Sequence, residues 1–253
     1  MSNTEAKPSR DSVRGLDRRA FLRLAALAGA GSLLPSFVRR SALAEAADTT
    51  RPAAPPGLEL ARFPEKTDLI LLTDRPPQLE TPLRYFRTDL TPNEAFFVRW
   101  HLAIIPTSVD TNAFRLKVGG HVGRELELSL DELRKNFEPA SVVAVNQCSG
   151  NSRSFFEPRV FGGQWGNGAV GNAKWTGVRL KDLLAKANVK AGAVDVSFGG
   201  LDRESMPTVQ PFVKSLALDH ANDGEVLVAY EMNGKPLPML NGFPLRLVLP
   251  GWF

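Results

Sequence analysis

Short stretches of apolar and β-branched residues recur from about residue 95 onward, each bounded by turn-forming residues. Six of them have the length and composition typical of strands: 96–101, 114–118, 141–145, 194–198, 226–230 and 245–249. Asn233-Gly234 follows the fifth stretch and is a strong signal for a hairpin turn between two strands. The pattern predicts a domain built mainly of short strands.

Two segments with helical periodicity interrupt these strands. Ser129-Leu130-Asp131-Glu132 is a capping box, which predicts a helix that runs to about Asn136. Residues 180–187 place apolar side chains at helical spacing. Because strands dominate over two or three helices and do not alternate regularly with them, the expected fold class is α+β.

The first 44 residues have the pattern of a targeting segment. Arg18-Arg19 precedes a mildly apolar run to Leu34, and Ala42-Leu43-Ala44 offers a small-x-small cleavage site. This pattern predicts a Tat-type signal, export by the Tat machinery and a periplasmic protein. A membrane anchor is disfavoured, because the apolar run is shorter than the roughly 20 residues that a spanning helix needs.

Removal of this segment changes the charge of the protein. The whole chain carries a formal charge of +4, whereas residues 1–44 alone hold eight basic and three acidic side chains. The remainder is therefore slightly acidic, and the basic composition does not indicate nucleic-acid binding. Residues 45–80 are rich in proline and lack periodicity, so we expect an extended leader over the surface of a domain that occupies 81–253.

Cys148 is the single cysteine of the chain, in a run that follows the apolar stretch 141–145. This position predicts a thiol where a strand meets a loop, among small residues that let a ligand approach the backbone. Arg153, five positions later, would favour a thiolate or an anionic ligand nearby. The alternative is an inert cysteine that packs in the core.

Alternation along 96–101 would place Phe97, Arg99 and His101 on one face of a strand, within reach of one ligand. An exposed edge strand with polar residues toward water is the alternative. The three histidines of the chain are too widely spaced to predict a zinc site, and the sequence has no C-x-x-C-H motif for haem. The glycine-rich run 162–171 lacks the features of a nucleotide loop and is expected to wrap a cofactor instead.

Four motifs together resemble the sulfite oxidase family of molybdopterin enzymes, and within it the bacterial periplasmic sulfite dehydrogenases. They are CSGNSR at 148–153, QWGNGAVGNAKWTG at 164–177, GLD at 200–202 and AYEMNG at 229–234. The resemblance covers about 80–253 and implies a mixed α+β molybdopterin-binding domain. It also implies a C-terminally incomplete chain, which stops before the family's cofactor lysine, active-site tyrosine and immunoglobulin-like dimerisation domain.

The resemblance implies that Cys148 is the protein ligand of a molybdenum ion whose other sulfurs come from the pterin. A soft thiolate suits such a metal. Arg99 and Arg153 match substrate-binding arginines, and Trp165 matches a tryptophan of the pocket wall. As an alternative, Arg153 would form a surface salt bridge with Glu157.

Cofactor binding is implied for further residues. His101 matches a pterin contact, and Phe97 and Arg99 are expected beside the same cofactor. Asp202 matches a pterin-binding aspartate, Asn241 stands where animal enzymes have a histidine, and Arg246 matches an arginine that grips the cofactor phosphate. A turn-forming role for Asp202 and a snorkelling role for Arg246 remain open.

The activity implied by the resemblance is oxidation of sulfite to sulfate by Mo-molybdopterin. With no haem in this chain, the electrons would pass to a c-type cytochrome or a haem subunit. Two other functions remain open: a periplasmic reductase of methionine sulfoxide or a related oxo compound, and an inactive truncated product. The two arginines favour a small anionic substrate over a neutral oxide.

Overall fold

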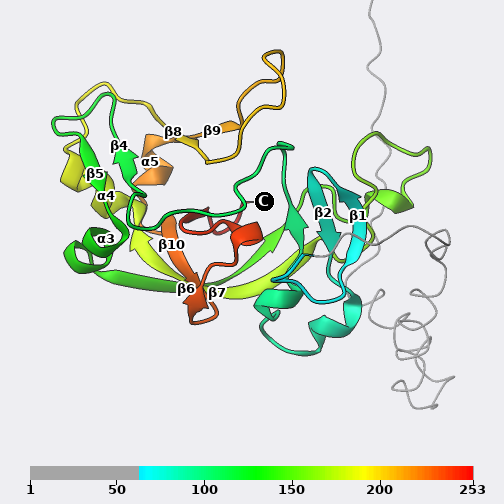
Figure 1. The fold of residues 1–253 in the computed structure, drawn as a ribbon. Coiled ribbons are helices and arrows are strands. Elements are labelled where there is room, and N and C mark those ends of the chain that lie inside the picture. The colour runs from blue at the N-terminus through cyan, green and yellow to red at the C-terminus, as the bar shows by residue number, and fades with distance from the viewer. Residues whose placement is uncertain (1–62, 253) are drawn as a thin grey trace, which may run out of the picture. The chain divides into compact units, whose positions relative to one another are not determined.

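The computed structural model describes residues 63–252, and the expected export signal at 1–44 lies outside them. The centre of the domain is a five-stranded antiparallel sheet (Figure 1). Its strands run in the order β11 (Lys235–Pro236), β10 (Leu227–Met232), β7 (Val170–Arg179) and β6 (Pro139–Gln147), and β12 (Arg246–Val248) also pairs with β10. Within 63–252, no helix is long and apolar enough to cross a membrane.

Three smaller sheets surround this one. β1 (Ile70–Asp74), β2 (Pro77–Glu80) and β3 (Val98–Arg99) form one, β4 (Leu116–Val118) and β5 (Leu126–Leu128) a second, and β8 (Asp195–Gly199) and β9 (Val213–Ala217) a third. The α-helices are α3 (Leu130–Asn136), α4 (Leu180–Ala187) and α5 (Leu218–Ala221). Short 3-10 helices are η1 (Leu83–Arg87), η2 (Asn93–Ala95), η3 (Arg153–Phe155) and η4 (Met239–Asn241).

The two predicted helices are confirmed. Ser129 accepts from the Glu132 N–H while the Glu132 carboxylate accepts from the Ser129 N–H, so the capping box starts α3 as its sequence dictates. Helix α4 spans 180–187 and buries Leu183 and Leu184. The hairpin turn at Asn233-Gly234 is also confirmed, with both residues at positive φ between β10 and β11.

Core clusters cover both faces of β10, which explains why all of its residues except Glu231 are buried. Leu227 and Ala229 belong to one core cluster, which also holds Phe96, Phe97, Trp165 and Trp175. Val228 and Tyr230 point into the other, which packs against α3, α4 and β9. Strands, helices and two core layers together make a mixed α+β domain, as expected.

The expected extended leader is wrong for the part that the structure describes. Ile70–Asp74 and Pro77–Glu80 form an antiparallel hairpin, and β2 continues the sheet to β3. Glu80 is buried, and its carboxylate accepts from the N–H groups of Gly166 and Gly168. These strands were not predicted from the sequence, because prolines occupy positions in and beside the hairpin turn and proline is unfavourable within strands.

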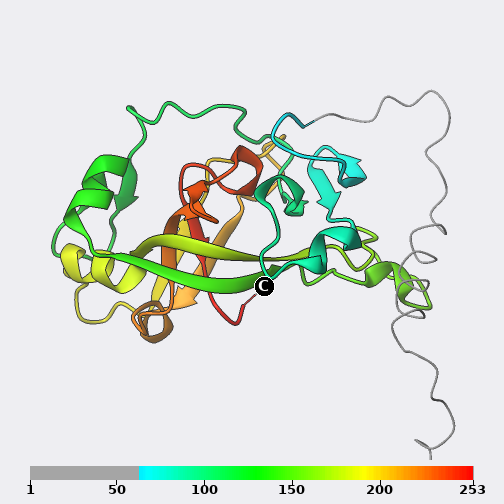
Figure 2. The same cartoon turned by 90° about the horizontal axis from the view of Figure 1, so that it is seen from below.

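The longest strand, β7, was not predicted because its sequence contains glycines and a lysine. Figure 2 shows β6 and β7 running side by side, and their register pairs Pro139 with Val178 and Gln147 with Val170. A side chain at Gly171 would overlap the Phe96 ring, and one at Gly177 would overlap the Val228 carbonyl. These glycines therefore allow close packing of the sheet.

Gly177→Ala is expected to destabilise the fold by at least about 2 kcal/mol, because an overpacked contact with backbone cannot relax by a side-chain rotation. Gly199→Ala is the matched control, since Gly199 lies in β8 with open space where a methyl group would stand. Chemical denaturation of both variants measures the difference. Equal midpoints for the two variants would contradict this account of β7.

Candidate cofactor and substrate site

Cys148 lies directly after β6, where the predicted strand-to-loop junction is found. Its N–H donates to the Ala169 carbonyl over 2.9 Å and so extends the β6–β7 ladder by one residue. Its Sγ accepts from the Gly150 N–H over 3.4 Å. The thiol is half-buried at the edge of the core cluster, so it is accessible to a ligand on one side.

The Arg153 guanidinium packs over two glycines of the same loop. Side chains at Gly150 or Gly162 would overlap it, and its Nη1 donates to the Gly163 carbonyl over 3.2 Å. Because Gly150 contacts both the guanidinium and the Cys148 sulfur, the cation and the thiol share one turn. The alternative salt bridge with Glu157 is wrong, since none forms between these two described residues.

Trp165 and Phe97 form the buried wall behind this turn. Trp165 is 1% exposed, and its ring meets Phe97 edge to face at 6.4 Å between centroids. Phe96 and Phe97 are both buried and stack at 5.4 Å. The predicted alternation therefore fails at Phe97, because β3 spans only Val98–Arg99 and both phenylalanines before it are buried.

Arg99 and His101 do lie together, as predicted, with 3.4 Å between Arg99 Nη1 and His101 Nδ1. Both are exposed. Arg99 pairs with Gln78 across β2 and β3, and the Gln78 side chain reaches Gly163 beside Trp165. Gly163 also accepts from Arg153, so Gln78 and Gly163 connect the two predicted substrate arginines.

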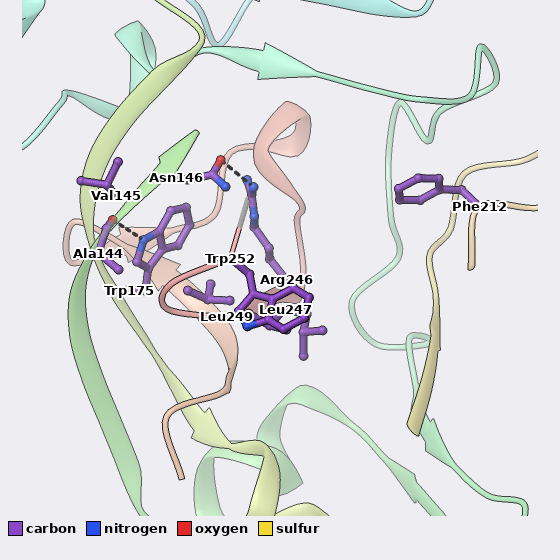
Figure 3. Close-up of a pocket in the computed structure, with 10 residues that line it drawn as sticks. Ala144, Val145, Asn146, Trp175, Phe212, Arg246, Leu247, Leu249 and Trp252 are labelled. Atoms are coloured by element: carbon purple, nitrogen blue, oxygen red, sulfur yellow. Dashed lines mark hydrogen bonds between the residues drawn. The ribbon is translucent and has the colours of Figure 1, made fainter. Parts of the chain in front are cut away.

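Arg246 provides a second cationic centre on the same side of β6. Its Nη2 donates to Asn146 Oδ1 over 3.0 Å, its Nη1 donates to the Asn241 carbonyl over 3.2 Å, and its guanidinium lies over the Trp175 ring (Figure 3). Burial lowers the pKa of this guanidinium to about 10, so it stays charged at neutral pH. No carboxylate within the described residues pairs with it.

A cavity of about 280 Å³ adjoins this guanidinium, close to the smallest ligand pockets, of roughly 300 Å³. Arg246, Asn146 and Trp175 line one side, and Figure 3 shows Phe212 across from them. His101 packs on Phe212 with 4.8 Å between ring centroids. His101 is thereby linked to the cavity through a ring contact rather than by lining it.

Asn241 is buried and joins the cavity to the N-terminal part of the domain. Its Nδ2 donates to the Phe97 carbonyl over 3.0 Å, and its Oδ1 accepts from Lys66 Nζ. Desolvation lowers the pKa of Lys66 to about 7, although the nearby carboxylates of Glu65 and Glu94 oppose this shift.

Asp202 is not brought to these groups by any contact found in 63–252. It follows β8 in a turn where its carboxylate folds back over Gly200, and its backbone carbonyl accepts from Arg203. This geometry favours the turn-forming alternative in the structure as it stands.

The strand β6 places Asn146, which binds Arg246, close to Cys148, which shares a turn with Arg153. Ala140, Val142, Ala144 and Asn146 face the core side, whereas Val143 and Val145 are each 57% exposed. Cys148 continues the core-side series, so it lies two residues, or about 7 Å along the strand, from Asn146. The thiol is not part of the cavity lining, but it lies on the same face of the chain as Asn146, which binds Arg246.

The residues present fit Mo-molybdopterin. A half-buried guanidinium beside a cavity, with no carboxylate partner in the described residues, suits a phosphate. A half-buried thiol beside a guanidinium suits a soft metal as a thiolate. Within residues 63–252 no three His, Cys, Asp or Glu side chains gather as metal ligands, so a metal at Cys148 requires further ligands from a cofactor.

Sequence reasoning missed Asn146, Gln78 and Lys66. Alternation along β6 from Cys148 could have identified Asn146, because Asn146 lies two positions before Cys148 and so on the same face of the strand. Gln78 and Lys66 lie in the stretch interpreted as a leader, and no local pattern connects Lys66 to Asn241, 175 positions away.

Comparisons with known proteins show the family of the chain. The family profile "Oxidoreductase molybdopterin binding domain" matches residues 101–253. The mitochondrial sulfite oxidases of Rattus norvegicus and Homo sapiens are each 42% identical over 183 residues, which cover 70% of this chain and 32% of theirs. The sulfane dehydrogenase SoxCD of Paracoccus pantotrophus superimposes with a TM-score of 0.61 at 25% identity, over 74% of this chain and 46% of that one.

The chain thus spans about a third of the length of these sulfite oxidases. The profile match nevertheless covers more than half of the chain and includes Cys148, Arg153, Trp165 and Arg246. The chain belongs to the sulfite oxidase family of molybdopterin-dependent oxidoreductases, and its cofactor is molybdenum held by molybdopterin.

Proposed function

We propose that this protein oxidises sulfite to sulfate outside the cytoplasm and passes the electrons to a c-type cytochrome or haem subunit. The observation that carries the proposal is the Arg153 guanidinium, which shares a turn with the Cys148 thiol and forms no ion pair with a carboxylate in residues 63–252. The sulfite oxidases at 42% identity support this substrate. The twin-arginine segment supports export and a periplasmic location.

The reaction is SO₃²⁻ + H₂O → SO₄²⁻ + 2H⁺ + 2e⁻. Molybdenum, when bound, supplies the oxygen-atom transfer and takes up the two electrons. Arg153 binds the anion next to the metal ligand, and its planar guanidinium can donate two parallel hydrogen bonds to sulfite oxygens. Arg99 adds a second positive charge, which raises the local concentration of the anion and holds it for reaction.

Buried aromatic groups define the other side of the substrate site. Trp165 and Phe97 exclude water from behind the Cys148 turn, so electrostatic attraction between sulfite and the guanidiniums is less screened there than in solvent. The Gly150 N–H stabilises negative charge on the Cys148 sulfur.

Arg153→Gln is expected to raise the KM for sulfite by about 10- to 100-fold, the equivalent of one hydrogen bond to a charged group. The variant should fold normally, because within residues 63–252 the Arg153 side chain donates a single hydrogen bond, to the Gly163 carbonyl. Arg124→Gln, at an exposed site before β5, is the matched control. Steady-state kinetics measure the effect, and an unchanged KM in Arg153→Gln would exclude this residue from substrate binding.

The proposal is tested by sulfite-dependent reduction of cytochrome c with the full chain produced in cells that make molybdopterin. Turnover with about one molybdenum per chain is expected. Molybdenum without sulfite turnover would instead favour the reductase of an oxo compound, and absence of molybdenum would favour the inactive product.

A further inference from the structure

Lys66 is a half-buried lysine in the segment before β1, outside the residues that the family profile matches. The Lys66 Nζ donates to the Asn93 carbonyl over 2.7 Å, to the Phe96 carbonyl over 3.3 Å and to Asn241 Oδ1. All three of its N–H bonds therefore have oxygen acceptors, none of which is a carboxylate. Such a group cross-links three separate parts of the chain.

Asn241 connects Lys66 to Arg246, which lines the cavity. With Oδ1 facing the ammonium, its amide nitrogen must face the other way, where it donates to the Phe97 carbonyl. Its backbone carbonyl accepts from Arg246, whose other nitrogen donates to Asn146. One chain of hydrogen bonds thus runs from Lys66 through Asn241 to the guanidinium that lines the cavity.

The carboxylates near Lys66 offset its charge only in part, and neither forms an ion pair with it within residues 63–252. Glu65 on its own segment accepts from the Met239 N–H, Glu94 on η2 is exposed, and Arg246 on β12 adds a further positive charge. Lys66 lies behind Asn241 and not in the cavity lining, yet its charge interacts with that of Arg246. Two half-buried cations this close, neither in an ion pair within residues 63–252, are stabilised when an anion binds beside them.

We propose that Lys66 is a positioning residue of the cofactor site, which orients Asn241 and Arg246 and adds positive charge for the phosphate of molybdopterin. This inference rests on the cofactor assignment above but not on sulfite as the substrate. It makes the N-terminal segment part of the cofactor site.

The inference predicts that anion binding depends on pH. Without an anion, Lys66 loses its charge as pH rises through about 7, whereas a bound anion raises its pKa and is held more tightly by the protonated form. Affinity for a phosphate monoester should therefore fall as pH rises from 7 to 9. A phosphate monoester is itself already largely dianionic in this range, since its second pKa is about 6.

The test uses full chain from cells that make no molybdopterin, titrated calorimetrically with glycerol 3-phosphate at pH 7 and pH 9. At pH 7 the wild type should bind at least about fivefold more tightly than Lys66→Met, and the ratio should shrink toward one at pH 9. Lys235→Met, at an exposed lysine in β11, should match the wild type. Binding should be lost in Arg246→Met, which would place the probe at this site.

A wild-type-to-variant affinity ratio of one at both pH values would overturn the inference. A ratio that is above one and equal at both pH values would overturn it too, because a merely structural role carries no pH dependence. Probe binding that survives Arg246→Met would overturn it as well. If Lys66→Met does not fold, the test is the affinity of the wild type for the probe at pH 7 and pH 9. An affinity that does not change with pH would contradict the role of Lys66. If the probe binds with this pH dependence but the molybdenum-loaded chain does not oxidise sulfite, sulfite is refuted as the substrate. The proposed role of Lys66 would then still stand.

Discussion

Replacement of Cys148 by serine is expected to reduce sulfite turnover by well over 100-fold, because the change removes the one thiolate that the chain offers to the metal. Changes outside the ligand shell already cost about 10- to 100-fold in metal sites, and a hydroxyl is a much poorer ligand for a soft metal. The fold should persist, since serine is nearly isosteric and its Oγ can accept from the Gly150 N–H as the sulfur does.

The comparison variant is Ser149→Ala, one position along the same turn, where the side chain is exposed. It should retain turnover within a factor of about two, in keeping with surface substitutions. Circular dichroism and the absorption of the metal–sulfur chromophore are measured beside activity. A Cys148→Ser protein with wild-type activity and absorption would show that Cys148 packs in the core without binding the metal.

Replacement of Arg246 by methionine is expected to lower the molybdenum and pterin content of the purified chain at least about tenfold. Removal of one partner of a desolvated charge pair costs about 2–5 kcal/mol, which exceeds a tenfold change in affinity. The stability of the chain without cofactor should change little, within about 2 kcal/mol. Two hydrogen bonds to Asn241 and Asn146 are lost, but an unpaired buried charge is removed as well.

Arg134→Met is a matched control, because Arg134 also stacks over an aromatic ring, that of Tyr230, but lies in α3 away from the cavity. It should leave the molybdenum content unchanged. Metal analysis and fluorescence of the oxidised pterin measure the outcome. Full cofactor content in Arg246→Met would support the snorkelling interpretation of this residue. It would also show that the cavity beside Arg246 does not hold the cofactor phosphate.

The helices could be predicted because their signals are local. Ser129 and Glu132 encode the start of α3 within four residues, and the leucines of α4 mark its buried face. The strand β7 could not be predicted from propensity, because Gly171 and Gly177 serve packing against Phe96 and Val228, which are distant in sequence. Tertiary contacts override local preference in such a strand.

The site was predictable where its residues share one turn or one strand face. Cys148 and Arg153 come together through Gly150, as their spacing suggested, and Arg99 lies beside His101. Long-range partners could not be foreseen. Lys66 reaches Asn241 only because the segment before β1 packs on η2 and η4, and no periodicity in a proline-rich stretch encodes that contact.

The central claim is that Cys148 and the Arg246 cavity hold one molybdenum cofactor that acts on sulfite. The most direct measurement is the absorption change of the purified, molybdenum-loaded chain on addition of sulfite under anaerobic conditions. The account predicts reduction of the metal by one equivalent of sulfite in the wild type and none in Cys148→Ser. A loaded wild type whose spectrum does not respond to sulfite would contradict the account.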